Sequence, residues 1–384
     1  MTRPRRGMKP RVVYWNNMPT PYMVERFNAA ASNPSFDFDA WFSTRVAAHR
    51  TWNVDESTWR FRYRYLPSVG RGEHPFAFPA PLLGGEAPDL VVSLYASTAF
   101  LFGWRLARLR GARTAFWAEV TFDSWVRRRR WKETLKKVVL PRADAILTAG
   151  RDGADFVKRY GVPDDRIFIV PHVIDFERYA RASAITSAER ERIRDRLGLR
   201  GTTFVYVGRL WRGKGVAYLI DAFASVQRAR EAEVSLLLVG DGPDEEWLRA
   251  RCEEERLANV AFAGFHQADT LPALFAAGDV FVFPTLGDPF GMVVPEAMAC
   301  GLPVISTSAA GELHDRVLDG VNGFVVAPAD SSALVAPMRR LAGDPELRRA
   351  MSEAARRTVE GQSPEVWAAA FDHAVTSILT RRTR

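Results

Sequence analysis

The chain has little cysteine: Cys252 and Cys300 are its only two in 384 residues. They lie far apart and match no metal-binding spacing, so we expect reduced thiols that fill space in the core of a cytoplasmic protein. No uninterrupted apolar run approaches the roughly 20 residues that a membrane-spanning helix needs. The start of the chain, MTRPRRGMKP, lacks the apolar centre of a signal peptide. These absences predict a soluble chain without a membrane span or a leader.

The composition is that of a globular protein, with 47% hydrophobic and 26% charged residues. A length of 384 residues indicates more than one domain, because single hydrophobic cores stop growing well below that size. The formal net charge of +8 favours anionic partners. Nucleic acid is a poor candidate for such a partner, since no recognised nucleic-acid-binding module accompanies the charge.

Short apolar runs alternate with helix-like segments along the whole chain, which predicts parallel, doubly wound sheets. In the first half the expected strands are residues 11–15, 36–42, 61–66, 90–94, 114–117, 145–147 and 167–170. In the second half they are residues 203–207, 234–239, 260–263, 280–283, 304–306 and 324–326. We therefore expect an α/β protein with two Rossmann-like domains, at residues 1–183 and 184–363. Residues 364–384 add a terminal helix with one apolar face.

Residues 287–305, GDPFGMVVPEAMACGLPVI, follow one of these strands and switch to helical spacing until Gly301. Open α/β sheets bind ligands at such turns, because the first helical amides lack backbone partners and favour an anion. Asp288 and Glu296 lie on either side of five amides, those of Phe290, Gly291, Met292, Val293 and Val294. Carboxylates accept from sugar hydroxyls and amides donate to phosphate, so the stretch predicts a site for a phosphorylated sugar. The alternative is an acidic helix start with a solvent-facing Glu296.

Residues 208–215, GRLWRGKG, come directly off an expected strand and lead into a helix. The spacing nearly matches the phosphate loop of nucleotide triphosphatases, but Gly215 stands where that loop has the hydroxyl that binds magnesium. Beside the turn at Gly208, Arg209 and Lys214 place two cations at a ligand edge. Two such cations can stabilise the charge on a departing phosphate, by about 3 kcal/mol each. The alternative is a pair of surface basic residues beside a glycine turn.

These stretches resemble the donor motifs of family-4 retaining glycosyltransferases, nucleotide-sugar enzymes of the GT-B fold. Residues 287–305 resemble the E-x7-E signature, with Asp288 in place of a first Glu that would reach about 1.5 Å further. The resemblance implies that Asp288 contacts hydroxyls of the donor sugar and that Glu296 contacts the nucleotide ribose. Arg209 and Lys214 match the second donor motif, which implies stabilisation of the leaving diphosphate without a metal ion or other cofactor.

Further donor contacts are implied by the same resemblance. Gly240, Asp241 and Gly242 end an expected strand, and their family counterparts lie near the donor nucleotide, although GDGP taken alone is a common turn. Phe265 would line the base pocket. In the family the last helix, here residues 364–384, crosses back onto the first domain, and we expect the same.

The first domain resembles the family mainly by its order of elements. Residues 16–22, NNMPTPY, resemble the PTPY loop of a bacterial subgroup. Asn17 and Thr20 could bond an acceptor hydroxyl or phosphate, and Thr20 could equally cap the next helix. Glu119 stands where relatives often have an active-site His, and it could orient the acceptor or pair with an arginine.

Residues 125–139, WVRRRRWKETLKKVV, predict a helix that is basic nearly all round. Such a helix is compatible with an anionic membrane surface or a phosphorylated acceptor. A solvated helix face explains the pattern equally well.

We therefore expect a retaining, metal-independent transferase that moves a hexose-type sugar from a UDP-, GDP- or similar nucleotide sugar to a hydroxyl. The acceptor would be a saccharide, a lipid-linked molecule or a small molecule. Synthesis of cell-surface polysaccharide or glycolipid, in the cytoplasm or peripherally at the inner membrane face, fits this expectation. The alternatives are glycosylation of a natural product, a sugar-nucleotide epimerase, a phosphorylase or polymer synthase, and a nucleotide-binding scaffold without turnover. The candidate catalytic residues are Arg209, Lys214, Asp288 and Glu119.

Overall fold

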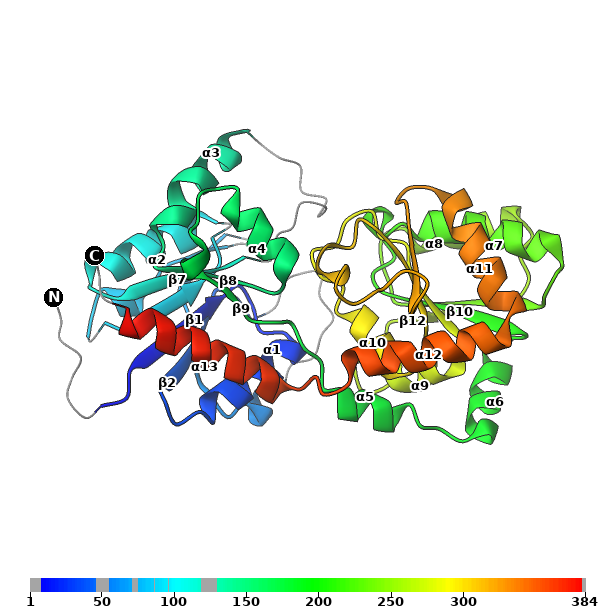
Figure 1. Ribbon diagram of the computed structural model, residues 1–384, viewed down its shortest axis with the longest axis horizontal. Helices are drawn as coiled ribbons and strands as arrows, with labels where there is room; N and C mark the ends of the chain where they lie inside the picture. The colour runs from blue at the N-terminus through cyan, green and yellow to red at the C-terminus, as the bar shows by residue number, and fades with distance from the viewer. Residues whose placement is uncertain are drawn as a thin grey trace. The chain divides into compact units, whose positions relative to one another are not determined.

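The structure is a computed structural model that describes residues 8–45, 55–70, 75–85, 87–95, 97–118 and 130–381. Contacts divide the chain into two compact units. Unit 1 comprises the described residues up to Val173 together with those from Pro364 onward, and unit 2 comprises Ile174–Ser363. Figure 1 shows both units, coloured along the chain.

Unit 1 is built on a sheet with the strand order β3-β2-β1-β6-β7-β8-β9. All neighbouring strands pair in parallel. The strands are β1 (Arg11–Asn16), β2 (Asp37–Phe42), β3 (Arg62–Tyr65), β6 (Leu90–Ser93), β7 (Arg113–Ala118), β8 (Ala145–Thr148) and β9 (Ile167–Ile169). Every strand predicted for the first half is present, and the predicted doubly wound sheet is confirmed.

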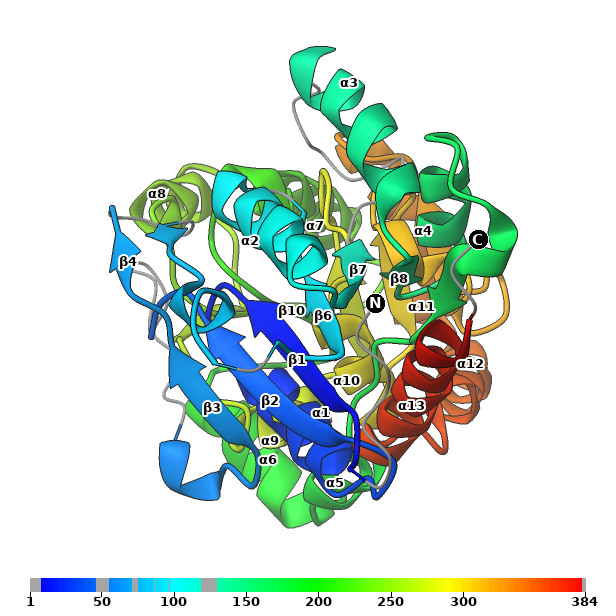
Figure 2. The ribbon, with the colours of Figure 1, turned by 90° about the vertical axis from the view of Figure 1, so that its left-hand side faces the viewer.

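Helices cover both faces of this sheet, as Figure 2 shows. They are α1 (Pro21–Ala31), α2 (Thr98–Leu109), α3 (Arg130–Val139), α4 (Arg151–Lys158) and α13 (Pro364–Thr380). In β1, Tyr14 contacts Phe27 of α1 and Phe371 of α13, with ring centroids 5.0 and 5.9 Å apart. The next residue, Trp15, contacts Phe100 of α2 at 4.9 Å. Because neighbouring strand residues point to opposite faces, α1 and α13 share one face and α2 lies on the other.

The terminal helix α13 is part of the core of unit 1. Its side chains Trp367, Phe371, Val375 and Ile378 are buried, as the apolar face in the sequence predicts. Leu379, expected on the same face, is half-buried. The helix packs against α1, so the last segment of the chain completes the unit in which the first strand lies.

Unit 1 also contains elements that the sequence did not predict. β4 (Ser68–Val69) and β5 (Phe76–Ala77) form an antiparallel hairpin after β3. Strands of two residues are too short for an alternating pattern to show. Single 3-10 turns complete the unit: η1 (Glu56–Thr58), η2 (Ala80–Leu82), η3 (Leu140–Arg142) and η4 (Asp164–Arg166).

Unit 2 contains a second parallel sheet, with the strand order β12-β11-β10-β13-β14-β15. Its strands are β10 (Thr202–Val207), β11 (Val234–Val239), β12 (Val260–Gly264), β13 (Val280–Phe283), β14 (Val304–Thr307) and β15 (Gly323–Val326). Each expected strand of the second half is present. The central strands β10, β11, β13 and β14 are buried throughout and mostly apolar, because helices cover both faces of a parallel sheet.

Two hydrophobic cores lie on the two faces of this second sheet. One is shared with α7 (Val216–Ala229), α8 (Glu245–Glu254) and α11 (Ser331–Gly343). The other is shared with α5 (Phe176–Ala182), α9 (Leu271–Ala277), α10 (Val293–Ala299) and α12 (Pro345–Val359). The remaining elements are α6 (Ser187–Arg196), η5 (Arg212–Lys214) and η6 (Gly311–Leu313).

The division between the units lies at Val173 and Ile174, earlier in the chain than the expected boundary after residue 183. The reason is α5, whose side chains Phe176, Tyr179 and Ala180 are buried in the core of unit 2. The sequence places the boundary later because the charged segment after α5 resembles a linker.

Both cysteines are free thiols. Burial raises the pKa of the Cys252 thiol to about 11 and that of the Cys300 thiol to about 12. Both are therefore protonated at neutral pH, which fits their expected role in filling space. Within the described residues, no helix combines the length and the apolar character needed to cross a bilayer.

Candidate functional site

The strand order of unit 2 has a point at which its direction reverses, between β10 and β13. From β10 the chain moves outward in one direction to β11 and β12, and in the other direction to β13, β14 and β15. The helices that follow β10 and β13 therefore lie on opposite faces, and the two loops stand at the point where open α/β sheets bind ligands. The predicted donor residues 208–215 follow β10, and residues 287–296 follow β13. Both stretches thus border the position at which open α/β sheets bind nucleotides.

Backbone hydrogen bonds join the loops at this edge of the sheet. Leu210 N, after β10, donates to Asp241 O, after β11, at 2.7 Å. Gly213 O accepts from Leu286 N, after β13, at 3.0 Å. The predicted donor residues of unit 2 are therefore carried by adjoining, mutually braced loops.

The glycines after β11 are needed for this bracing. A Cβ on Gly240 would lie 1.9 Å from the carbonyl oxygen of Gly208, and one on Gly242 would lie 2.2 Å from another carbonyl oxygen of the same loop. Close approach of the two loops thus requires glycine here, whatever nucleotide contacts these positions make. Between them Asp241 is exposed, and Phe265, just beyond β12, is half-buried.

Gly215 is the residue at which the loop after β10 turns into α7, with φ at +68°. A Cβ there would lie 1.9 Å from the carbonyl oxygen of Pro284. We expect Gly215→Ala to lower the free energy of unfolding by about 3 kcal/mol or more, because the left-handed backbone and the clash both disfavour a side chain. Gly198→Ala is the matched control, since Gly198 has φ at +66° with nothing within 4 Å, and it should lose only about 1 kcal/mol. Urea unfolding compares the two variants, and equal losses would contradict the clash.

Lys214 and Asp288 form an ion pair between the loops after β10 and β13, through Nζ and Oδ2. The other carboxylate oxygen, Oδ1, accepts from the amides of Phe290 at 3.1 Å and Gly291 at 2.8 Å. The ammonium also lies 5.9 Å from the ring centroid of Phe283. The two charged side chains keep 25% and 14% of their exposure, so the pair is partly shielded from water. Both oxygens of Asp288 therefore already accept hydrogen bonds within the protein, and Oδ2 keeps one further acceptor position.

These contacts differ from the roles that the sequence suggests for the residues of the turn. The sequence assigns sugar hydroxyls to Asp288 and phosphate to the amides of Phe290 and Gly291. In the structure those two amides donate to Asp288, and Lys214 also binds it. A diphosphate that binds Lys214 must therefore compete with Asp288 for the ammonium, because a cation is shared between the two anions.

Arg209 is exposed, and among the described residues its guanidinium has no hydrogen-bond or ion-pair partner. Its carbonyl oxygen accepts from the phenol of Tyr206 at 3.0 Å. Burial, and to a lesser degree the charge of Asp288, raise the pKa of the Tyr206 phenol, which therefore remains a donor. Tyr206, which the sequence predicts only as a strand residue, thus holds the backbone of Arg209 in place.

The rest of the 287–305 stretch divides between core and edge. Val294 is fully buried, and its amide donates to Gly291 O at 2.9 Å. Phe290 is also buried, with the Arg316 guanidinium 4.7 Å from its ring centroid. Met292, Val293 and Glu296 are half-buried at the start of α10. Glu296 and its half-buried neighbours are therefore the accessible side chains at the start of α10, while Val294 packs in the core.

The sequence reading missed one segment of this edge, residues 308–313 after β14. Asp288 N donates to Ala309 O at 3.3 Å, and Gly311 N donates to Asp288 O at 2.9 Å. Glu312, next in the chain, is buried although it is acidic. The signal that could have found this segment is a strand followed within five residues by a glycine and an acidic residue, Gly311 and Glu312.

In unit 1 the candidate acceptor residues lie at the corresponding edge of the first sheet. Asn17 and Thr20 follow β1, and both are buried. Thr20 occupies the N-cap position of α1, but its side chain makes no capping hydrogen bond. Its hydroxyl is buried without a partner among the described residues, so the capping alternative is wrong. Glu119, one residue beyond β7, lies outside the described residues.

The basic segment 125–139 is described only from Arg130 onward, as α3. Lys136 pairs with Glu133 at 2.9 Å and lies over the rings of Phe156 and Tyr160, at 5.1 and 5.5 Å. This lysine therefore serves internal contacts, and the expected membrane role of the segment stays a prediction.

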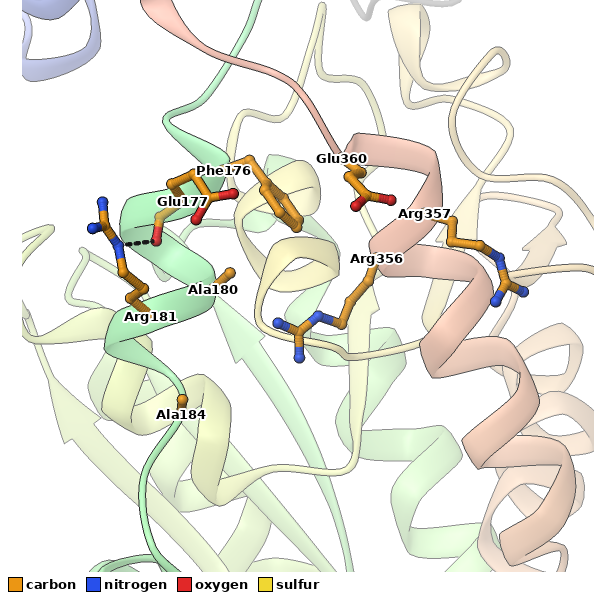
Figure 3. Close-up of a pocket in the computed structure, with 8 residues that line it drawn as sticks. All are labelled: Phe176, Glu177, Ala180, Arg181, Ala184, Arg356, Arg357 and Glu360. Atoms are coloured by element: carbon orange, nitrogen blue, oxygen red, sulfur yellow. Dashed lines mark hydrogen bonds between the residues drawn. The ribbon is translucent and has the colours of Figure 1, made fainter.

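A separate hollow of about 380 Å³ lies between α5 and α12 of unit 2, away from the loops at the strand ends (Figure 3). Its charged lining residues are Glu177, Arg181, Arg356, Arg357 and Glu360. Opposite charges are mixed in it, and none of the predicted site residues borders it. It therefore adds nothing to the candidate site.

The architecture defines the class of protein. Two Rossmann-like units make up the GT-B fold of glycosyltransferases, and solved structures agree. HepE of Anabaena in complex with UDP has a TM-score of 0.79 at 19% identity, covering 96% of this chain and 100% of that one. Sucrose-phosphate synthase of Thermosynechococcus elongatus has a TM-score of 0.76 at 20% identity, covering 96% and 98%. At these identities the likeness establishes the fold.

The family follows from the sequence comparisons. Residues 9–178 match the family Glycosyltransferase Family 4, and residues 189–358 match Glycosyl transferases group 1. The chain belongs to the glycosyltransferases that these two descriptions cover.

The curated relatives match over part of their length. The D-inositol 3-phosphate glycosyltransferase of Salinispora arenicola is 31% identical over 232 residues, which is 57% of this chain and 51% of the relative. The alpha-D-kanosaminyltransferase of Streptomyces kanamyceticus is 29% identical over 229 residues, 58% and 57% of the two chains. The chain thus spans about half the length of these relatives.

Proposed function

We propose that this protein transfers a hexose-type sugar from a nucleoside diphosphate sugar to a hydroxyl acceptor, with retention of configuration. The observation that carries the proposal is the ion pair of Lys214 and Asp288 between the β10 and β13 loops, with the exposed Arg209 in the same β10 loop as Lys214. The HepE structures contain UDP and UDP-glucose, which supports a nucleotide sugar as the donor.

The chemistry that this group supports is departure of a nucleoside diphosphate. The bond between the anomeric carbon and the phosphate oxygen breaks, and the electron pair leaves with the phosphate. Lys214 and Arg209 meet that growing charge, while a carboxylate at Asp288 suits the hydroxyls of the sugar. Attack by the acceptor on the same face, with the leaving phosphate taking the acceptor proton, would retain the configuration. Glu119 would orient that acceptor, and Glu296 would bind the ribose.

The experiment that tests the proposal compares donor consumption with and without acceptors. Purified protein is incubated with UDP- and GDP-sugars, first alone and then with saccharide, lipid-linked and small-molecule acceptors. Release of nucleoside diphosphate that depends on an acceptor supports transfer. Conversion of the donor sugar without an acceptor indicates an epimerase, and nucleotide binding without turnover indicates a scaffold.

We expect transfer to continue in excess chelator. Arg209 and Lys214 supply the positive charge that a divalent ion supplies in other diphosphate-leaving enzymes. Initial rates are measured with and without chelator, and then with manganese added back. A rate that chelator abolishes and manganese restores would contradict this mechanism.

The acceptor side and the cellular location are the finer parts of the proposal. We propose a saccharide or lipid-linked acceptor bound near Asn17 and Thr20, in the synthesis of cell-surface polysaccharide or glycolipid. Residues 125–139 would then bring the protein to the inner face of an anionic membrane. The unpartnered, buried hydroxyl of Thr20 supports a polar ligand at this edge of unit 1.

A further inference from the structure

One side of unit 1 carries exposed apolar side chains that neither the core nor the candidate site uses. In the described part of the chain, six of the fifteen exposed large apolar side chains lie between residues 68 and 109: Val69, Phe76, Phe78, Leu83, Phe102 and Leu109. Their exposed fractions run from 38% to 80%. We call these six side chains the apolar patch. Single exposed apolar residues are ordinary, but a contiguous group marks an interaction surface.

The aromatic side chains of the apolar patch are in contact through Phe102. Phe102, on α2, has its ring centroid 6.4 Å from that of Phe76 and 6.1 Å from that of Phe78, with which it stacks. Val69 lies directly opposite Phe76 in the β4–β5 hairpin, so both side chains are on one face of it. Leu83 follows η2, which packs against α2. Leu109 lies two turns beyond Phe102 on the same side of α2. The patch therefore joins a hairpin and a helix into one surface.

The described charged residues that border the apolar patch are basic; Glu73 and Glu86, next to it in the sequence, lie outside the described residues. Arg105 lies on α2 between the two exposed apolar residues of that helix, is itself exposed, and has no partner among the described residues. Arg110, at the end of α2, donates to Gly85 O at 2.6 Å, which places its charge beside the loop after η2. α2 contains no Asp or Glu, and neither do residues 66–70 and 75–85 around the hairpin and η2. An anionic partner is complementary to this border.

We propose that the apolar patch and Arg105 dock unit 1 on the surface of an anionic lipid bilayer. Aromatic and aliphatic side chains enter the boundary between headgroups and acyl chains, and arginines bind the anionic headgroups. A second copy of this chain is a poorer occupant, because matching patches would bring their arginines together.

The position of the apolar patch fits a lipid-linked acceptor. The hairpin follows β3 and α2 follows β6, so both begin from the sheet edge at which Asn17 and Thr20 follow β1. Both elements can be followed in Figure 2. A bilayer on this surface would bring acceptors with an apolar anchor to that edge. This step rests on the proposed function, whereas lipid binding does not.

Sedimentation with vesicles tests the proposal. Vesicles of phosphatidylcholine alone are compared with vesicles that contain an equal share of phosphatidylglycerol. We expect at least tenfold stronger binding to the anionic vesicles, and at least tenfold weaker binding by the double variant Phe76→Ser with Phe102→Ser. Arg105→Gln should weaken binding several-fold and reduce its dependence on salt. The control is Trp247→Ser, because Trp247 is 53% exposed on α8 of unit 2, outside the patch.

A second double variant protects the test against a folding defect. Val69 and Leu109 are 80% and 72% exposed and make none of the ring contacts, so Val69→Ser with Leu109→Ser should keep the melting temperature and still lose vesicle binding. The proposal fails if the unaltered protein does not bind anionic vesicles, or if both double variants bind them as strongly as the unaltered protein does. It also fails if Trp247→Ser loses as much vesicle binding as the double variants. It fails equally if the variants change the oligomeric state of the protein in solution without vesicles, because the patch would then be an interface between copies of the chain. UDP binding, measured separately, should be the same in all the variants and in the unaltered protein. If the unaltered protein does not bind UDP, this counts against the proposed function and not against lipid binding.

Discussion

Lys214→Ala should lower the rate of sugar transfer by about 10² to 10³ while donor affinity falls much less. The ammonium lies in the loop after β10 and pairs with Asp288. The charge that it meets on a leaving diphosphate is greatest in the transition state, so its loss acts mainly on turnover. Steady-state rates with a nucleotide sugar and an acceptor measure the effect, and titration with free nucleoside diphosphate measures the affinity.

Lys214→Arg is the matched variant, because it keeps the charge and changes its shape. We expect only partial recovery of the rate, since a planar guanidinium cannot occupy the place of a compact ammonium. A Lys214→Ala variant with a near-normal rate would show that the cation at this position does not stabilise the leaving group.

Asp288→Asn should lower the transfer rate by about 10² while affinity for nucleoside diphosphate stays near normal or becomes several-fold tighter. The amide oxygen can still accept from Phe290 and Gly291, so the turn should persist. The negative charge that holds Lys214 is lost, which frees the ammonium for phosphate. The contact proposed with the sugar hydroxyls is weakened at the same time.

Glu296→Gln provides the contrast to Asp288→Asn. A ribose contact is present with the donor and with the free nucleotide alike, so this variant should weaken both together. Calorimetric titration of both variants with nucleoside diphosphate and with the intact sugar nucleotide separates the two roles. Equal losses of nucleotide affinity in the two variants would refute the separation.

Much of the fold could be predicted because apolar periodicity is a local property. Each strand of both parallel sheets overlaps a predicted strand, and α13 coincides with an apolar helical face. The β4–β5 hairpin could not be predicted, because two-residue strands leave no periodic trace. The unit boundary was placed late because burial of Phe176 and Tyr179 depends on which core they reach, which their own neighbours in sequence do not reveal.

The candidate site shows the same division. The sequence by itself determined that Arg209, Lys214, Asp288 and Glu296 lie where strands are followed by helices. A strand, a glycine turn and a helix start each depend on residues that are consecutive in the chain. Only the tertiary structure decided that the loops after β10 and β13 adjoin, because strand order depends on pairing between residues far apart in the chain. Only it showed that both oxygens of Asp288 are already bonded, and that Glu312 reaches the same edge. The partner of a charged side chain depends on which residues lie near it in three dimensions, and residue type and sequence spacing do not predict this.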